Sequence, residues 1–160
     1  MGILTEDMRR VVREQRLGFV ATICPDGTPN LSPKGTLNVW DGDRLVFADI
    51  NSPRTVQNLR HNPAVEIIVV DALTRKGYRF KGTGAVLTEG SLFEEIVAAY
   101  RSRGSTSAIR QIVLVRVERA VALVSPVYAT GVPEEEIRRR WTAHYLGVDT
   151  DRGGGKPQDV

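Results

Sequence analysis

The chain has 160 residues, a length typical of one domain that buries its core without metal or disulfide staples. Its formal net charge is +3, but 22 basic residues are interspersed with 19 acidic ones, so we expect no nucleic-acid partner. One cysteine and two histidines predict neither a disulfide nor a metal site, and the lack of a long apolar run predicts a cytoplasmic protein without a membrane partner.

The first part of the chain predicts one helix and three strands. Met8, Val11 and Val12 recur at helical spacing behind Thr5, a good N-cap residue, which predicts a short amphipathic helix over residues 5–16. Turn residues then separate β-prone segments. We expect strands at 17–24, 30–40 and 44–50, paired as a three-stranded meander.

The rest of the chain predicts alternating helices and strands. We expect helices at 53–61, 91–104 and 134–146, and strands at 64–72, 78–88 and 109–124. Ser91 and Glu94 form a capping-box pattern, and Gly82 and Gly84 suggest a bent or bulged strand. Residues 150–160 resemble a disordered tail in composition, so we expect one domain over residues 1–149.

The order of these elements predicts a mainly β fold with helices. Six strands joined mainly by hairpins favour an antiparallel, Greek-key-like barrel over a doubly wound parallel sheet. No Gly-x-Gly-x-x-Gly opens a helix, and no Walker loop is present.

The junction over residues 47–63 is a candidate anion site. Ser52 can cap the helix start, and Pro53 suits its first turn. Arg54 and the hydroxyl of Thr55 follow at the positive end of the helix dipole, where a phosphate is favoured. A capped connecting helix with no ligand explains the same residues.

The second strand departs from a regular pattern at Pro33, Lys34 and Gly35. A ligand against the backbone would explain the glycine by close approach and the lysine as a charge partner, whereas an irregular edge strand needs no ligand. Because a hairpin would pair this strand with residues 44–50, Lys34 and Arg54 could converge on one ligand. No nucleophile and base are paired in the sequence, so we assign no catalytic residue and expect a cofactor to carry any reaction.

Four stretches carry a family resemblance. They are Val-Phe-Ala-Asp at 46–49, Ser-Pro-Arg-Thr at 52–55, Asn-Leu-x-x-Asn-Pro-Ala-Val at 58–65 and Tyr-Arg-Phe-Lys-Gly-Thr-Gly at 78–84. In this order they resemble the pyridoxamine 5′-phosphate oxidase-like FMN-binding proteins of split β-barrel fold. The resemblance implies a homodimer with FMN at the subunit interface and a small-molecule substrate.

The resemblance also implies site residues. The cofactor-binding residues would be Lys34, Arg54 and Thr55 at the phosphate and Ser32, Thr36, Ala48, Asp49 and Asn51 near the ring or the ribityl chain. Thr55 stands where the family motif usually has lysine. Trp141 and Tyr145 could lie on the substrate side, although an aromatic helix face can equally be plain packing.

The family's vitamin B6 oxidases carry a C-terminal Arg-x-His, which this sequence lacks. We therefore expect an FMN-dependent oxidoreductase that does not oxidise vitamin B6. Two alternatives share the site: a non-catalytic flavin-binding or electron-storage protein, and a reductase that uses the deazaflavin F420. The shortage of histidines disfavours haem.

Overall fold

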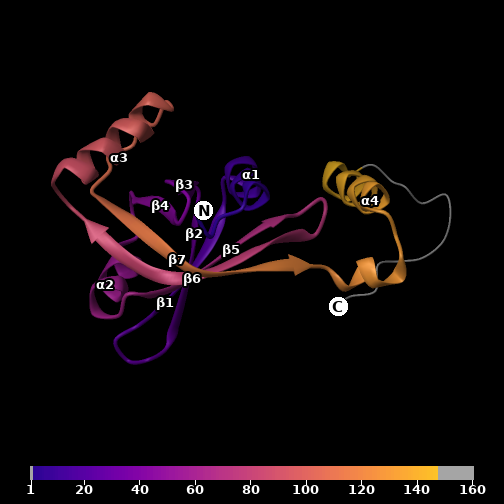
Figure 1. Cartoon of the computed structure of the whole chain (residues 1–160), viewed down its shortest axis with the longest axis horizontal. Coiled ribbons are helices and arrows are strands. Elements are labelled where there is room, and N and C mark those ends of the chain that lie inside the picture. Colours follow the sequence, from indigo (N-terminus) through magenta and orange to yellow (C-terminus); the bar gives the residue numbers. More distant parts are fainter. Residues whose placement is uncertain (1, 148–160) are drawn as a thin grey trace. The chain divides into compact units, whose positions relative to one another are not determined.

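A computed structural model describes residues 2–147 of the chain (Figure 1). Its elements, in chain order, are α1 (Glu6–Gln15), β1 (Gly18–Ile23), β2 (Pro29–Lys34), β3 (Asn38–Val39), β4 (Arg44–Asp49), α2 (Pro53–His61), β5 (Ala64–Asp71), β6 (Lys76–Leu87), α3 (Ser91–Ser102), β7 (Gln111–Val124), the 3₁₀-helix η1 (Pro126–Thr130) and α4 (Glu134–Leu146). The expected tail at 150–160 lies outside the described residues.

The described residues form two compact units. The first contains residues 2–70 and 77–123, and the second contains residues 71–76 and 124–147. The first unit holds α1 to α3 and most of the sheet. The second holds the tip of the β5–β6 hairpin, η1 and α4.

The strands form one curled, antiparallel sheet, which confirms the predicted split-barrel class (Figure 1). It has seven strands in the order β2-β1-β5-β6-β7-β4-β3. The prediction of six strands is wrong because the second strand divides into β2 and β3. The predicted meander is also wrong: β2 pairs with β1, whereas β3 pairs with β4 at the other edge of the sheet.

The division follows from local chemistry. Pro33 cannot donate to a strand ladder, and Gly35 is a poor strand residue, so the chain leaves the ladder after Lys34. Thr36 then replaces the missing ladder contacts. Its hydroxyl accepts from the Ala48 amide at 3.0 Å and donates to the Ala48 carbonyl at 3.1 Å. The Thr36 side chain therefore holds the segment between β2 and β3 against β4.

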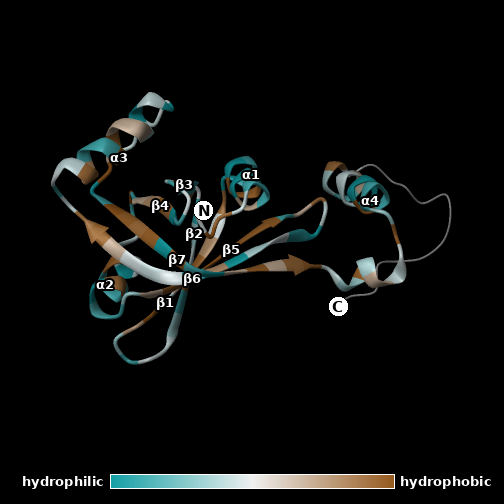
Figure 2. Cartoon of the chain, in the orientation of Figure 1, coloured by the Kyte–Doolittle hydropathy of each residue, from teal (hydrophilic) through white to brown (hydrophobic). Residues whose placement is uncertain are grey.

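The main core fills the inside of the curled sheet. Apolar residues that alternate along the strands meet the inner faces of α1 and α2, and Figure 2 shows brown stretches on β4, β5 and β7 against teal on α1. The largest fully buried side chains of this core include Leu4, Leu45, Phe47, Ile67 and Phe80.

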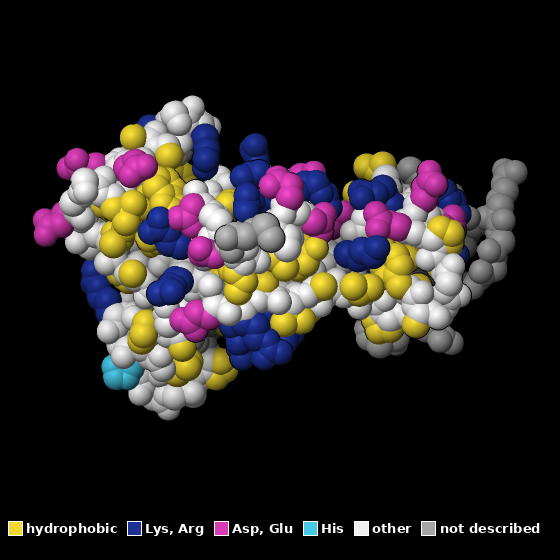
Figure 3. Space-filling view, in the orientation of Figure 1, with side chains coloured by type: hydrophobic (Ala, Val, Ile, Leu, Met, Phe, Trp, Pro, Cys, Tyr) yellow, Lys and Arg dark blue, Asp and Glu magenta, His cyan; other side chains and the backbone are white. Residues whose placement is uncertain are grey.

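A second apolar cluster lies on the opposite face of β4 and β7, under α3. Ile96 and Tyr100 of α3 pack on Val46, Ile112 and Leu114. Half-buried Leu92 and Phe93 lie at its rim. Hydrophobic side chains gather beside α3 in Figure 3, with acidic and basic groups around them.

Two of the three predicted helix caps differ in the structure. The Thr5 hydroxyl accepts from the Met8 amide at 3.3 Å, which confirms that cap. The predicted capping box at Ser91 is wrong, because the helix begins one residue earlier than that motif requires. Its N-cap residue is Gly90, with a φ of 97°, and Ser91 is the first residue of the helix itself. Ser52 is the N-cap residue of α2, but its side chain makes no capping hydrogen bond.

The glycine at position 82 allows two strands to come very close together. A Cβ atom built on Gly82 would lie 1.9 Å from the carbonyl oxygen of Arg116 on β7. We expected this glycine to mark a bend or a bulge; the close approach of the β7 backbone is reason enough for it.

The second unit is tied together by side chains. Tyr128 donates to the Thr74 carbonyl at 2.6 Å, and the Arg75 guanidinium lies 4.0 Å from the centre of the Trp141 ring. The ion pairs of the unit are Lys76–Glu134 at 2.7 Å and Arg138–Asp71 at 3.5 Å. The hairpin tip is thus held to α4 through three of these contacts and to η1 through the fourth.

Candidate functional site

A buried lysine joins β2 to α2. Lys34 is only 4% exposed, and its ammonium donates to the Ser32 hydroxyl at 2.6 Å and to the Thr55 hydroxyl at 3.3 Å. Its partner in the β1–β2 register is Gly18, where a Cβ atom would lie 2.4 Å from the Leu37 side chain. Three of the predicted cofactor-binding residues therefore lie in direct contact.

The charge of this lysine is poorly compensated. Burial lowers the pKa of Lys34, and the nearby Asp49 carboxylate only partly opposes that shift. Within residues 2–147, both hydrogen-bond acceptors of the ammonium are neutral hydroxyls. The site therefore holds a cation that an incoming anion would stabilise.

The α2 N-terminus keeps its first amides uncapped by any side chain. Ser52 is the N-cap residue, but its side chain makes no capping hydrogen bond, so the predicted serine cap is wrong. Instead, the Asp49 carboxylate accepts from the Ser52 amide at 2.6 Å and fixes the turn that leads from β4 into α2. Pro53 lies in the first turn as predicted. First-turn amides that no side chain caps, together with the helix dipole, favour an anion at this end.

The remaining predicted cofactor-binding residues surround this helix start. Arg54 is exposed, and its side chain makes no hydrogen bond or ion pair with residues 2–147. Asn51 is also exposed, in the link between β4 and α2. Asp49 is 3% exposed, and Ala48 is bound to Thr36 as described above.

Tyr100 of α3 is a supporting residue that the sequence did not reveal. It is buried, and its hydroxyl donates to the Thr36 carbonyl at 2.7 Å. Burial raises the pKa of Tyr100, so the hydroxyl keeps its proton for this bond. In the sequence it is one aromatic residue on an amphipathic helix, which gives no hint of a polar contact.

Trp141 and Tyr145 lie in the second unit, with ring centroids 6.1 Å apart. His144 lies against both rings, at 5.2 Å from Trp141 and 5.4 Å from Tyr145. Tyr145 is 57% exposed. Their predicted substrate-side role stays a prediction.

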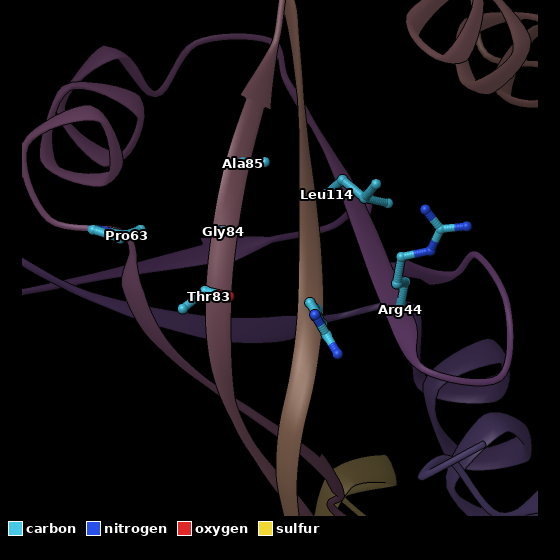
Figure 4. Close-up of a pocket in the computed structure, with 7 residues that line it drawn as sticks. Arg44, Pro63, Thr83, Gly84, Ala85 and Leu114 are labelled. Atoms are coloured by element: carbon cyan, nitrogen blue, oxygen red, sulfur yellow. The ribbon is translucent and has the colours of Figure 1, made fainter.

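A surface depression of about 310 Å³ lies on a different part of the sheet (Figure 4). Thr83, Gly84 and Ala85 of β6 and Leu114 of β7 line it, with Arg44 at one side. None of its lining residues is a predicted cofactor-binding residue.

Residues 2–147 contain neither a metal-ligand cluster nor a membrane-spanning helix. No group of three or more His, Cys, Asp or Glu residues there could hold a metal ion. No helix in the same range is both long and apolar enough to cross a membrane.

Among the proteins that resemble this chain are one curated relative and three solved structures. An uncharacterized protein of Methanocaldococcus jannaschii is 30% identical over 89 residues, which covers 54% of this chain and 58% of that protein. The crystal structure of HupZ from Group A Streptococcus has a TM-score of 0.69 and 30% identity, and the match covers 77% of this chain and 96% of that one.

Two more distant structures share the fold. One is an FMN-binding protein from Syntrophomonas wolfei, with a TM-score of 0.64, 16% identity and coverage of 76% of this chain and 87% of that one. The other is an F420 reductase, with a TM-score of 0.57, 20% identity and coverage of 73% and 98%.

A match over most of the sequence identifies the family of this chain. Residues 4–127 match the sequence model described as pyridoxamine 5′-phosphate oxidase, from before α1 into η1. The stretches that carried the resemblance all fall within this range. The chain belongs to the pyridoxamine 5′-phosphate oxidase family.

Proposed function

We propose that this protein binds FMN and acts as an FMN-dependent oxidoreductase on a small substrate. The observation that carries the proposal is the contact between the buried Lys34 ammonium and Thr55, beside the uncapped start of α2. The FMN-binding protein of the same fold adds support for this class of cofactor.

The donor set suits a phosphate monoester. The Lys34 ammonium has three donors, of which two go to Ser32 and Thr55. Each of these hydroxyls accepts from the lysine and keeps its own hydrogen for a phosphate oxygen. Thr55 can therefore contribute a hydrogen bond where the family motif usually supplies a charge. When bound, FMN would supply the hydride chemistry, and this chain would bind and orient it.

The first experiment is direct. The purified protein should retain or take up FMN, seen as flavin absorbance after gel filtration and as a rise in melting temperature at saturating FMN. A protein that shows neither does not bind FMN, and the proposal would then be rejected.

Arg54→Ala should weaken FMN binding by about 1.5 kcal/mol, the lower end for a hydrogen bond to a charged group, because this arginine is exposed. Arg60→Ala is the matched control. Arg60 lies on the same helix but at its other end, where it donates to Gln111 at 2.7 Å. Equal affinities in both variants would remove Arg54 from the site.

We propose further that the protein works as a homodimer with the flavin at the subunit interface. Light scattering with and without FMN measures the oligomeric state. NAD(P)H oxidation by the flavin-loaded protein, with a range of acceptors, separates the enzyme from an electron-storage protein. Repeating the binding measurement with F420 tests the deazaflavin alternative. Vitamin B6 oxidation is not proposed, because no Arg-x-His occurs in the sequence.

A further inference from the structure

An asparagine is buried on the inner face of α2. Asn58 is 2% exposed, whereas its neighbours on that face, Val56 and Leu59, belong to the apolar core. Its amide donates to the Thr22 hydroxyl at 3.0 Å and lies 3.6 Å from the Cys24 sulfur. A polar group in this position is retained only with a partner, because burying it unpaired is costly.

Thr22 connects this asparagine to β2. It is 2% exposed, and its hydroxyl also accepts from the Asn30 amide at 3.2 Å. Asn30 is the register partner of Thr22 in the β1–β2 pair. The hydroxyl thus joins α2, β1 and β2 at one point.

Two polar connections therefore run side by side between α2 and β2. One is Asn58–Thr22–Asn30, and the other is Thr55–Lys34–Ser32. Residues three apart on a helix lie on neighbouring turns of one face, and alternate residues of a strand share a face. The first connection thus lies about one helical turn behind the second.

Apolar packing alone does not fix the rotation or the axial position of a helix, because it has no preferred direction. Hydrogen bonds do, because their geometry is narrow. The apolar contacts of Val56 and Leu59 would hold α2 on the sheet. The hydrogen bond of Asn58 would fix the rotation of α2 about its axis, and with it the direction of the first turn of the helix.

We propose that Asn58 and Thr22 are positioning residues for the anion site, which hold the first turn of α2 in register with Lys34. They need not touch the ligand. The proposal rests on the proposed function for its ligand, FMN, although the coupling of α2 to β2 is a property of the ligand-free protein as well.

The test uses two nearly isosteric variants, Asn58→Leu and Thr22→Val. Each should raise the Kd for FMN about 5- to 10-fold, the loss of one positioning hydrogen bond. The double variant should be no weaker than the weaker single variant, because both residues act through one connection. If Asn58→Leu does not fold, Thr22→Val alone carries the test.

Val56→Ala is the matched control, since it truncates a core side chain on the same helix without touching the polar connection. It should lower the melting temperature and leave the Kd unchanged. In ligand-free protein, the Thr55 and Lys34 amide NMR signals should move in both polar variants and stay in place in Val56→Ala.

The outcomes separate the two proposals. An unchanged Kd in both polar variants, or additive losses in the double variant, overturns the positioning role. A Kd increase that matches that of Val56→Ala overturns it too, because it reflects stability alone. If the wild-type protein does not bind FMN, the proposed function fails, and the amide signals in the ligand-free protein then decide the positioning role.

Discussion

Lys34→Met should weaken FMN binding by about 2 kcal/mol, roughly 30-fold, and leave the protein at least as stable as the wild type. The affinity falls because a charge-assisted contact to the phosphate is lost. The stability is kept because methionine fills the same space without desolvating a charge, and each hydroxyl loses only one donor to a neutral oxygen. Fluorescence titration of FMN and urea unfolding measure the two effects.

Lys81→Met is the control, since the side chain of Lys81 is 61% exposed and pairs with Glu66 at the surface. It should change neither quantity by more than about 0.5 kcal/mol. An Lys34→Met variant that binds FMN normally would remove this lysine from the phosphate site. One that fails to fold would give Lys34 a structural role.

The same variant should change how stability depends on pH. Burial lowers the pKa of Lys34 below its usual 10.5, so between the folded and unfolded pKa values the unfolded chain binds more protons. The wild-type protein should therefore gain stability as pH rises through that window towards 10.5, relative to Lys34→Met. Urea unfolding at several pH values in this window would reveal the divergence.

Gly82→Ala should destabilise the protein by about 3 kcal/mol or more, as a severe case of overpacking. The added carbon would lie 1.9 Å from the Arg116 carbonyl oxygen, and a strand backbone cannot rotate away as a side-chain end can. Urea unfolding gives the change in free energy.

Gly35→Ala is the matched substitution for comparison, because a Cβ atom there meets nothing within 4 Å. Its effect should stay within about 1 kcal/mol, with any gain coming from the unfolded chain. Equal effects at positions 35 and 82 would mean that β6 and β7 lie further apart than described.

Local signals in the sequence predicted most of the elements. Thr5 and the spacing of Val11 and Val12 marked α1, and the pattern from Glu134 to Gly147 marked α4 with its end. These features depend on residues a few positions apart. The antiparallel barrel class followed from the order of elements and is confirmed.

The errors concern contacts over longer distances. Residues 30–40 look like one strand, but their two halves lie at opposite edges of the curled sheet, and only the tertiary fold decides that. The convergence of Lys34 with α2 was expected from a hairpin with β4. It arises instead because β2 lies beside β1, under α2. Asn58 begins the stretch at 58–65 that carries the family resemblance, but nothing local marked it as buried, since a polar residue on a short helix usually faces solvent.

The hydrogen bonds of the Thr36 hydroxyl also affect the tendency of the protein to aggregate at high concentration. Because β3 spans only Asn38–Val39, the outer edge of β4 would otherwise present the Ala48 amide and carbonyl unpaired. Unpaired groups on a strand edge invite a strand from another chain and so lead to aggregation. Thr36 forms hydrogen bonds with both groups, so this part of the β4 edge is not free to pair with another chain. The strand is therefore interrupted between β2 and β3 without leaving an edge that promotes aggregation.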